Sequence, residues 1–347
     1  MSQLNFTTIF DSNYLSRGLS LYRSLKSCHD DFKLFVVALD DICYEYFKVN
    51  KYNNITVISL GEIEDNFPEL LPLKQERSFV NYLFTLSPYY PLYVLQKNPE
   101  LKHICSLDAD QYFYSSPKQV FDALADYSVL ITPHRFTPEL LRTGIEKYGR
   151  FNVSFQVFRN NETGKSCLNF WREQCFNWCE DELSEGRFAD QKYLDLWQDK
   201  FTNEVGEITQ VGLGLAPWNI NNFKISKISS QLRVGDEPLI LFHYQGLRIL
   251  EELFVYTAFD VYQAKMTGII KQRIFEPIVK SILTIQGNKN DQISRNKKAF
   301  SVNEVKPNSK SSYFKILKGE MITFKRYLQL KSIKSGTLGR VKKFFGK

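Results

Sequence analysis

Apolar runs and amphipathic segments alternate along the first 136 residues of the chain. A solid run of apolar and β-branched residues is typical of a strand covered on both faces, and apolar residues every three or four positions indicate a helix. On this basis we expect strands at residues 4–10, 33–39, 54–60, 102–107 and 128–133. Their alternation with helical segments predicts an α/β fold with a mostly parallel, doubly wound central sheet that helices flank.

Helical spacing marks the segments between these strands. The clearest case follows the first strand, where apolar residues recur at Leu15, Leu19, Tyr22 and Leu25. Residues 79–96 are also expected to be helical, with an irregular start because Pro88 and Pro91 interrupt the pattern. A further helix is expected at residues 118–125, before the fifth strand.

Beyond Phe136 the regular alternation of strands and helices ends. We expect, in order, a strand, a long amphipathic helix, a shorter helix and two late strands, at residues 151–158, 161–183, 188–197, 208–220 and 238–250. After Gly287 the chain becomes polar enough to form a linker, so the folded body is expected to end near that residue.

Composition places the chain among folded globular proteins, since 43% of its residues are hydrophobic and 15% are aromatic. It has no uncharged apolar run of about 18 residues, so no segment is predicted to span a membrane. The N-terminus meets Asp11 early and lacks the basic start of a signal peptide. The expected location is therefore cytoplasmic, and the six cysteines are expected to be reduced, buried thiols.

Charge divides the chain into two parts. Residues 287–347 carry 16 Lys and Arg against 3 Asp and Glu, a net charge of +13, whereas residues 1–286 carry 29 against 35, a net charge of −6. We therefore predict an α/β body at residues 1–286 and a basic linker with an amphipathic tail at residues 287–347.

Residues 313–347 mix Lys and Arg with Phe, Ile and Leu at loosely helical spacing. Such a segment suits an anionic membrane surface, which would make the protein peripheral at the inner membrane face. A solvated tail or one bound to a protein partner is the alternative. No nucleic-acid partner is expected, because no recognition motif accompanies the basic residues.

Asp108 and Asp110 follow the fourth expected strand in the segment LDAD. In an open α/β sheet the ligand site lies beyond the carboxyl ends of the strands, and alternation along an extended chain puts both side chains of an Asp-x-Asp pair on one side. Two adjacent carboxylates repel each other unless a cation joins them, and Mg²⁺ or Mn²⁺ shared with substrate phosphates is the natural partner. An ordinary polar turn after a strand is the alternative interpretation.

Two other segments are expected at the same edge of the sheet. Asp11, Asn13 and Tyr14 follow the first strand and offer a carboxylate, an amide and an aromatic ring, which suit a nucleoside. His243 ends a late strand, and a neutral imidazole there would complete a carboxylate-rich metal site. Taken singly, the first segment also fits a polar turn, and His243 also fits a buried histidine with satisfied hydrogen bonds.

Together these segments resemble the nucleotide-sugar-dependent glycosyltransferases of the GT-A fold, in particular glycosyltransferase family 8 and its bacterial relatives. The resemblance spans residues 4–250 and rests on five motifs in the family's order. They are Asp11-x-Asn13-Tyr14, Asp108-x-Asp110, Asn152 at the start of a strand, Asp190-Gln191 at the start of a helix, and His243-x-x-Gly246.

The resemblance implies a metal-dependent hexosyltransferase-type enzyme that moves a sugar from a nucleotide-diphosphate donor, usually a UDP-sugar, to a glycan or lipid-linked acceptor. Asp108, Asp110 and His243 would bind Mn²⁺ or Mg²⁺, and residues 11–14 would bind the nucleoside. The Lewis acidity of the metal stabilises the charge that develops on the departing diphosphate. Synthesis of a surface polysaccharide or lipopolysaccharide is the setting that the resemblance suggests.

The resemblance also implies which residues carry the chemistry at the sugar. Asn152, Asp190 and Gln191 would face the sugar and its reacting carbon. A carboxylate or amide near that carbon can stabilise the oxocarbenium-like charge. Because Asp190 and Gln191 are the usual candidates in retaining members of the family, retention is favoured over inversion.

The sequence departs from the family pattern in ways that leave the donor open. The helix before the metal motif, SPYYPLYVLQ at residues 87–96, has no base, and a Lys usual near the C-terminus of the family is missing. Gly246 and Arg248 remain to bind the donor near its diphosphate. Trp218, in the segment GLGLAPWNI, is either a platform for a sugar or a buried Trp in a Pro turn.

Other classes of protein fit the sequence less well. Aspartyl-nucleophile phosphotransferases place Asp-x-Asp on the first strand before Thr or Val, whereas here Gln111 follows a pair that lies over 100 residues into the chain. A nucleotidyltransferase needs a Gly-rich basic loop after the first strand, which DSNYLSRGLS does not supply. The non-enzymatic alternative is an inactive nucleotide- or sugar-binding module of a membrane-associated assembly, which would not hydrolyse a donor.

Overall fold

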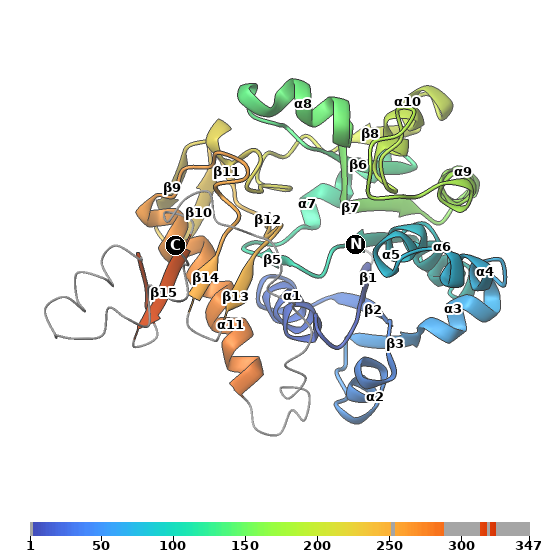
Figure 1. The fold of residues 1–347 in the computed structure, drawn as a ribbon, viewed down its shortest axis with the longest axis horizontal. Helices are drawn as coiled ribbons and strands as arrows, with labels where there is room; N and C mark the ends of the chain where they lie inside the picture. The colour runs from blue at the N-terminus through green and yellow to red at the C-terminus, as the bar shows by residue number, and fades with distance from the viewer. Residues whose placement is uncertain (1–2, 251–253, 288–312, 318–319, 324–347) are drawn as a thin grey trace, which may run out of the picture.

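A computed structural model of the chain describes residues 3–250, 254–287, 313–317 and 320–323 (Figure 1). At its centre is a seven-stranded sheet in which six strands run in one direction and β7 runs in the other. In spatial order the strands are β3 (Ile55–Ser59), β2 (Phe32–Ala38), β1 (Leu4–Phe10), β4 (His103–Leu107), β7 (Phe151–Arg159), β6 (Val129–Pro133) and β8 (Val205–Glu207). The predicted α/β class with a mostly parallel sheet is confirmed.

Successive side chains of the central strands pack on opposite faces of the sheet. In β2, Leu34 and Val36 belong to one apolar core, whereas Phe35 and Val37 belong to a second core on the other face. A strand covered on both faces is mostly apolar along its whole length, which makes these runs easy to recognise in the sequence. β1 has the predicted bounds, and the other strands predicted up to residue 158 are correct to within one residue at each end.

Helices cover both faces of the sheet (Figure 1). The first core is shared with α1 (Leu15–Cys28), α2 (Asp41–Val49), α7 (Lys118–Asp122) and the end of α11 (Glu276–Gly287). The second is shared with α3 (Leu60–Asn66), α4 (Leu70–Glu76), α5 (Phe79–Leu86), α6 (Tyr89–Lys97) and α9 (Glu162–Asn177). The interrupted pattern at residues 79–96 thus becomes two helices, α5 and α6, that part at Ser87 and Pro88.

The remaining elements surround a third apolar core. Short strands make two small sheets there: β5 (Gln111–Phe113) with β12 (Leu241–His243), and β9 (Ile225–Ile228) with β10 (Gln231–Val234) and β11 (Glu237–Pro238). Helix α8 (Pro138–Tyr148) connects β6 to β7, and a π-helix, η4 (Ile270–Phe275), leads into α11. Because β12 pairs with β5, residues 241–243 lie close to the carboxyl end of β4 although they are distant in the sequence.

Three predictions for the second half need correction. Residues 208–220 are a loop with a single bridge, from Leu215 to Phe242, and not a strand, because their apolar side chains are buried by packing without a ladder of hydrogen bonds. The helix predicted to reach residue 183 ends at Asn177, since the backbone of Trp178 is extended. The shorter helix is a 3₁₀ turn, η2 (Lys192–Leu196), followed by α10 (Trp197–Lys200).

Part of the predicted basic tail is folded against the body. β15 (Tyr313–Leu317) and β16 (Glu320–Thr323) extend β13 (Arg248–Leu250) and β14 (Phe254–Tyr256) into a four-stranded antiparallel sheet. Phe314 and Met321 are buried in the third core. These residues therefore form strands where helical spacing was predicted. The rest of the tail lies outside the described residues, and the domain boundary at residue 286 stays a prediction.

The cysteines match the expectation of a reduced protein. All six are free thiols, and every one except Cys28 is buried. Burial raises the pKa of the Cys105 and Cys167 thiols, so they are unreactive at neutral pH. Among the helices of the described residues, none combines the length and the apolar character needed to cross a membrane.

Candidate metal centre and active site

The three candidate metal ligands meet at one edge of the central sheet. Asp108 follows β4, Asp110 precedes β5, and His243 ends β12. In the antiparallel pairing of β5 with β12, His243 lies opposite Gln111, and the backbone N–H of Tyr244 donates to the carbonyl of Asp110 at 3.0 Å. Backbone pairing therefore places the imidazole beside two carboxylates that are far away in the sequence.

The distances in this cluster suit shared coordination. Nε2 of His243 lies 3.1 Å from Oδ1 of Asp110 and 3.6 Å from Oδ2 of Asp108. One ligand atom from each of the three side chains lies within 4.8 Å of the others. The His243 side chain is only 4% exposed, and within the described residues neither ring nitrogen has a partner in hydrogen-bonding geometry. The cluster expected from the sequence is therefore assembled.

The charges of the cluster perturb one another. Burial raises the pKa of Asp108 to about 6, although the charge of His243 opposes that shift. Burial also acts to raise the pKa of Asp110, but His243 outweighs it and the pKa is lowered. For His243, burial acts to lower the pKa, and Asp110 and then Asp108 more than offset it, so the pKa is raised. Two carboxylates around one imidazole favour a positive charge between them, either a proton or a metal cation.

The predicted nucleoside segment forms a tight turn between β1 and α1. Oδ1 of Asp11 accepts hydrogen bonds from the backbone N–H groups of Asn13 and Tyr14, each at 3.1 Å, and Oδ2 accepts one from Nδ2 of Asn13 at 2.7 Å. The Asp11 carboxylate thus stabilises its own turn. Burial raises the pKa of Tyr14, and Asp110 adds to the shift, which places the phenol near the metal centre. Nucleoside binding by this turn stays a prediction.

Arg17 belongs to the same neighbourhood, and motif reasoning missed it. It lies three residues after Tyr14 in α1, a spacing that puts both side chains on one face of a helix. Its guanidinium lies 4.8 Å from the centroid of the Tyr14 ring, and its Nη2 donates to the carbonyl of Leu247 at 3.0 Å. Arg17 also helps His243 to lower the pKa of Asp110. The spacing from Tyr14 was the one available signal.

The three residues predicted to face the sugar lie together. Asn152 is in β7, whereas Asp190 and Gln191 immediately precede η2, yet Nδ2 of Asn152 donates to Oε1 of Gln191 at 3.3 Å. Burial raises the pKa of Asp190 to about 7; Ser87 opposes the shift, and the negative charge of Asp108 adds to it. Asp190 is therefore close enough to the metal centre to feel its charge. The catalytic roles of these residues stay predictions.

The last two predicted donor-binding residues follow β12. Gly246 has a φ of +75° in a turn closed by a hydrogen bond from the N–H of Leu247 to the carbonyl of Tyr244 at 2.9 Å. A Cβ at Gly246 would lie 2.8 Å from Cβ of Ala258, so this turn requires glycine. Arg248 begins β13, and no hydrogen bond or ion pair within the described residues joins its side chain to the three candidate metal ligands. Its contact with a donor stays a prediction.

Trp218 is a buried residue and forms a wall of the metal centre. It is 5% exposed, its Nε1 donates to the carbonyl of His134 at 2.9 Å, and its ring meets that of His243 edge to face with centroids 5.3 Å apart. The interpretation as a buried Trp in a Pro turn is therefore confirmed. His134 was not predicted from the sequence, and the structure places its ring against that of Trp218.

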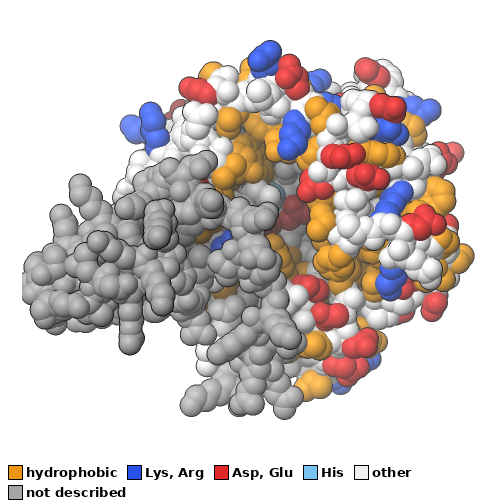
Figure 2. All heavy atoms as spheres, viewed as in Figure 1, with side chains coloured by type: hydrophobic (Ala, Val, Ile, Leu, Met, Phe, Trp, Pro, Cys, Tyr) orange, Lys and Arg blue, Asp and Glu red, His pale blue; other side chains and the backbone are white. Residues whose placement is uncertain are grey.

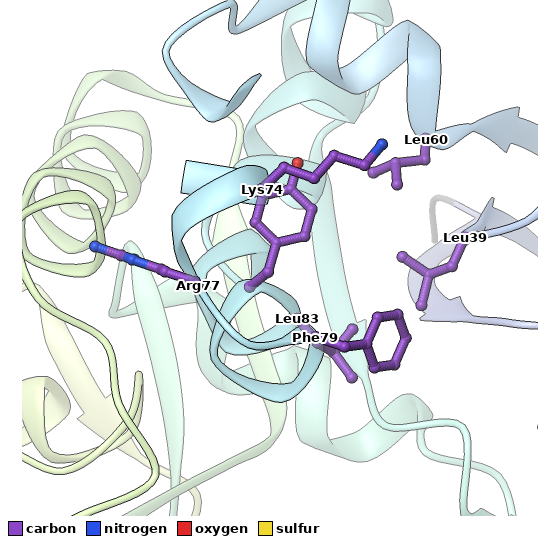
Figure 3. A pocket seen from close by; sticks show the side chains of 7 residues that line it. Leu39, Leu60, Lys74, Arg77, Phe79 and Leu83 are labelled. Carbon is purple, nitrogen blue, oxygen red and sulfur yellow. The ribbon is translucent and has the colours of Figure 1, made fainter. Parts of the chain in front are cut away.

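Two hollows in the surface differ in character. Figure 2 shows one near the centre of the molecule, with acidic side chains inside it and apolar side chains on its border, in the part of the view where Figure 1 places β5 and β12. A separate cavity of about 270 Å³ lies between the ends of β2 and β3 and helices α4 and α5 (Figure 3). Arg77 extends away from it and donates to the carbonyls of Cys175 and Phe176 at 2.6 and 2.5 Å. None of the predicted site residues lines this second cavity.

Comparison with known proteins gives the family of the chain. No protein-family model matches it. The uncharacterized protein YfnD of Bacillus subtilis (strain 168) is 30% identical over 254 residues, which cover 73% of this chain and 80% of YfnD. The uncharacterized protein YfnF of the same organism is 29% identical over 251 residues, which cover 71% of this chain and 82% of YfnF. The chain belongs to the family of YfnD.

Solved structures similar to this one include glycosyltransferases. The galactosyltransferase LgtC, in complex with donor and acceptor sugar analogues, is 16% identical with a TM-score of 0.45, and the match covers 70% of this chain and 87% of LgtC. Mouse xyloside xylosyltransferase 1, in its apo form, is 11% identical with a TM-score of 0.44, and the match covers 70% of this chain and 98% of that one. The likeness concerns the fold only.

Proposed function

We propose that the chain is a metal-dependent glycosyltransferase of the GT-A type, which moves a sugar from a nucleotide-diphosphate donor to a glycan or lipid-linked acceptor. The observation that carries the proposal is the cluster of Asp108, Asp110 and His243 at the carboxyl end of β4. Ligand sites in open α/β sheets lie at this edge. The five motifs that suggested the function also include the turn of residues 11–14, which lies beside the cluster.

A divalent cation such as Mn²⁺ or Mg²⁺ fits this cluster for two reasons. Carboxylate oxygens are hard ligands that such ions prefer. The buried imidazole of His243 also offers a nitrogen that lacks a hydrogen-bonding partner among the described residues. Asp108, Asp110 and His243 would hold the ion, which when bound supplies positive charge for the diphosphate leaving group.

The residues on the other side of the centre suit the sugar. Cleavage of the bond between the anomeric carbon and the diphosphate leaves positive charge on the sugar ring. Asp190 offers a carboxylate and Gln191 a carbonyl oxygen to stabilise that charge, and Asn152 holds Gln191 through their 3.3 Å hydrogen bond. Because Asp190 and Gln191 match the usual candidates in retaining members of the family that the sequence resembles, we favour a retaining reaction. The anomeric configuration of the product tests this choice.

A UDP-sugar is the donor that we propose. The ring of Tyr14 would stack on the base, and the turn held by Asp11 and Asn13 would bind the rest of the nucleoside. Gly246 would let the backbone approach the diphosphate. Arg248 would supply a cation there, and Arg17, which lies over Tyr14, is a second basic side chain beside this segment.

The acceptor that we propose is a glycan or lipid-linked intermediate of a surface polysaccharide or lipopolysaccharide, reached from the cytoplasmic side of a membrane. The net charge of +13 on residues 287–347 supports this assignment, because clustered Lys and Arg are attracted to anionic lipid headgroups. Co-sedimentation with anionic vesicles, compared with neutral ones, tests it. Equal retention by both kinds of vesicle would argue against a role of the charge.

Metal affinity is expected to rise with pH. The pKa of His243 is raised and that of Asp108 is raised to about 6, so at low pH both groups hold protons that a cation must displace. Between pH 5.5 and pH 7.5 the affinity for Mn²⁺ should increase at least about tenfold. Calorimetry at pH 6 in buffers of different ionisation enthalpy should detect proton release on binding. A pH-independent affinity without proton release would contradict these assignments.

Donor turnover is the direct test of the proposed activity. The full chain is incubated with Mn²⁺ and with UDP-, GDP- or CDP-sugars, and release of the nucleoside diphosphate is followed with and without EDTA. Metal-dependent release from one donor would support the proposal. Binding of a nucleotide without turnover of any donor would instead favour the inactive binding module.

A further inference from the structure

His134 links two parts of the candidate site. It follows β6, is 4% exposed, and its Nε2 lies 3.4 Å from Nδ2 of Asn152. The same nitrogen of Asn152 donates to Oε1 of Gln191 at 3.3 Å. Side chains from three separate segments therefore form one line of contacts. This line ends at Gln191, the residue that the proposed function places at the reacting carbon.

The neighbouring hydrogen bonds fix the orientation of both amides. Oδ1 of Asn152 accepts from the backbone N–H of Ser154 at 2.9 Å, so Nδ2 is the atom that faces His134 and Gln191. Nε2 of Gln191 donates to the carbonyl of Tyr148 at 3.0 Å, which leaves Oε1 to face Asn152. An amide nitrogen has two protons, and Asn152 directs one to each partner. This arrangement requires Nε2 of His134 to be the acceptor and the ring proton to be on Nδ1, a buried atom with no hydrogen-bond partner among the described residues.

The imidazole of His134 packs against two aromatic rings. The ring of Phe136 stacks on it with centroids 4.4 Å apart and an interplanar angle of 15°, and the ring of Trp218 meets it at 69° with centroids 5.6 Å apart. Burial lowers the pKa of His134 to about 3, and the backbone of Gly149 and Arg150 offsets only part of that shift. The ring is therefore neutral at working pH, as an acceptor nitrogen requires.

We propose that His134 is a positioning residue for the sugar-facing amides. The inference rests on the proposed function and assigns to the Nε2 lone pair the role of fixing Asn152 and, through it, Gln191. In this arrangement the second lone pair of Gln191 Oε1 is free to face the sugar. Without the acceptor, Asn152 keeps its hydrogen bonds to Ser154 and Gln191 but loses its third partner, so the oxygen of Gln191 is held less firmly where charge develops on the sugar. Preorganised dipoles of this kind act chiefly on the transition state.

Two substitutions and one control separate positioning from packing. His134→Phe keeps a ring for stacking but has no acceptor, whereas His134→Gln restores a carbonyl oxygen near the position of Nε2. Phe136→Leu loosens the stacking and leaves the acceptor in place. We expect kcat about 10- to 100-fold below wild type in His134→Phe, with donor KM and Mn²⁺-dependent nucleoside diphosphate affinity within about twofold. His134→Gln should recover at least half of that loss on a logarithmic scale, and Phe136→Leu should stay within about threefold of wild type.

Nitrogen NMR tests the arrangement without any turnover. The chain has four histidines, so ¹⁵N-histidine labelling gives few signals, and those absent in His134→Phe belong to His134. Nε2 of His134 should be unprotonated throughout pH 5–8. The side-chain amide protons of Asn152 should exchange slowly in wild type and His134→Gln, and faster in His134→Phe.

Each possible result supports or overturns the positioning role of His134. An unprotonated Nε2 together with a loss of kcat in His134→Phe that His134→Gln reverses would support the proposal. A protonated Nε2, an unchanged kcat in His134→Phe, or a parallel loss of kcat, nucleotide affinity and thermal stability in both variants would overturn it. If the wild-type chain turns over no donor, the proposed function fails. The nitrogen spectrum and the exchange of Asn152 then decide the positioning on their own.

Discussion

Asp110→Asn is expected to abolish metal-dependent donor turnover, with kcat at least about 10³-fold below wild type. Oδ1 of Asp110 lies 3.1 Å from Nε2 of His243, and its side chain is 16% exposed against 36% for Asp108. Asn has nearly the same shape but lacks the negative charge that holds a divalent cation. The backbone hydrogen bond from Tyr244 to Asp110 does not involve the side chain, so β5 and β12 should remain paired.

Steady-state release of nucleoside diphosphate with Mn²⁺ measures this effect. Asp126→Asn is the matched control, because Asp126 is an exposed carboxylate in the connection between α7 and β6. The control should keep kcat within about twofold of wild type, as surface substitutions away from a site usually do. Thermal melts of both variants establish that they are folded. An Asp110→Asn protein with more than a tenth of wild-type turnover would contradict the assignment of this residue as a metal ligand.

Asp190→Asn is expected to make the protein more stable at high pH and less active. Burial raises the pKa of Asp190 from 3.8 to about 7, so the folded state disfavours the ionised form. The unfolded chain therefore releases this proton first, and wild-type stability falls as the pH rises from about 4 through 7. Asn cannot ionise, so at pH 8 the variant should exceed wild type by on the order of 2–4 kcal/mol in the free energy of unfolding. At pH 4 the two proteins should be nearly equal.

Denaturant unfolding in EDTA at pH 4 and pH 8 measures this difference without a bound metal. Turnover measures the predicted loss of activity. In Asp190→Asn, kcat should fall about 100-fold, while Mn²⁺-dependent nucleotide affinity is unchanged. A residue that lowers stability in return for activity is typical of a catalytic site. Unfolding curves that differ equally at the two pH values would show that Asp190 is not a buried acid of raised pKa. Unchanged turnover would remove it from the chemistry.

The central sheet is predictable from sequence because its strands are covered on both faces. Six of the seven residues of β2 are apolar, Lys33 being the exception, so the run stands out against the amphipathic helices around it. The loop at residues 208–220 shows the limit of the same signal. Leu213, Leu215 and Ala216 are buried there without a ladder, and Gly214 has a φ of +78°. Burial alone does not distinguish a strand from a packed loop.

Only those residues of the candidate site that belong to a recognisable motif could be predicted from the sequence. Asp108 and Asp110 are separated by one residue and form a visible motif. Three-residue strands such as β5 and β12 leave no periodic pattern, so the pairing that places His243 beside them follows from tertiary structure. Arg17 and His134 belong to no motif. Their partners come from other segments, such as Leu247 for Arg17 and Asn152 for His134, and such contacts cannot be read along the chain.

The central claim is that Asp108, Asp110 and His243 hold a cation that binds the diphosphate of a nucleotide sugar. Calorimetric titration of the full-length wild-type chain with UDP, GDP and CDP, in Mn²⁺ and in EDTA, tests it most directly. We predict that one nucleotide, with UDP first, binds in Mn²⁺ and binds at least about 100-fold more weakly in EDTA. Binding of none of the three, or equal binding with and without the metal, would contradict the account.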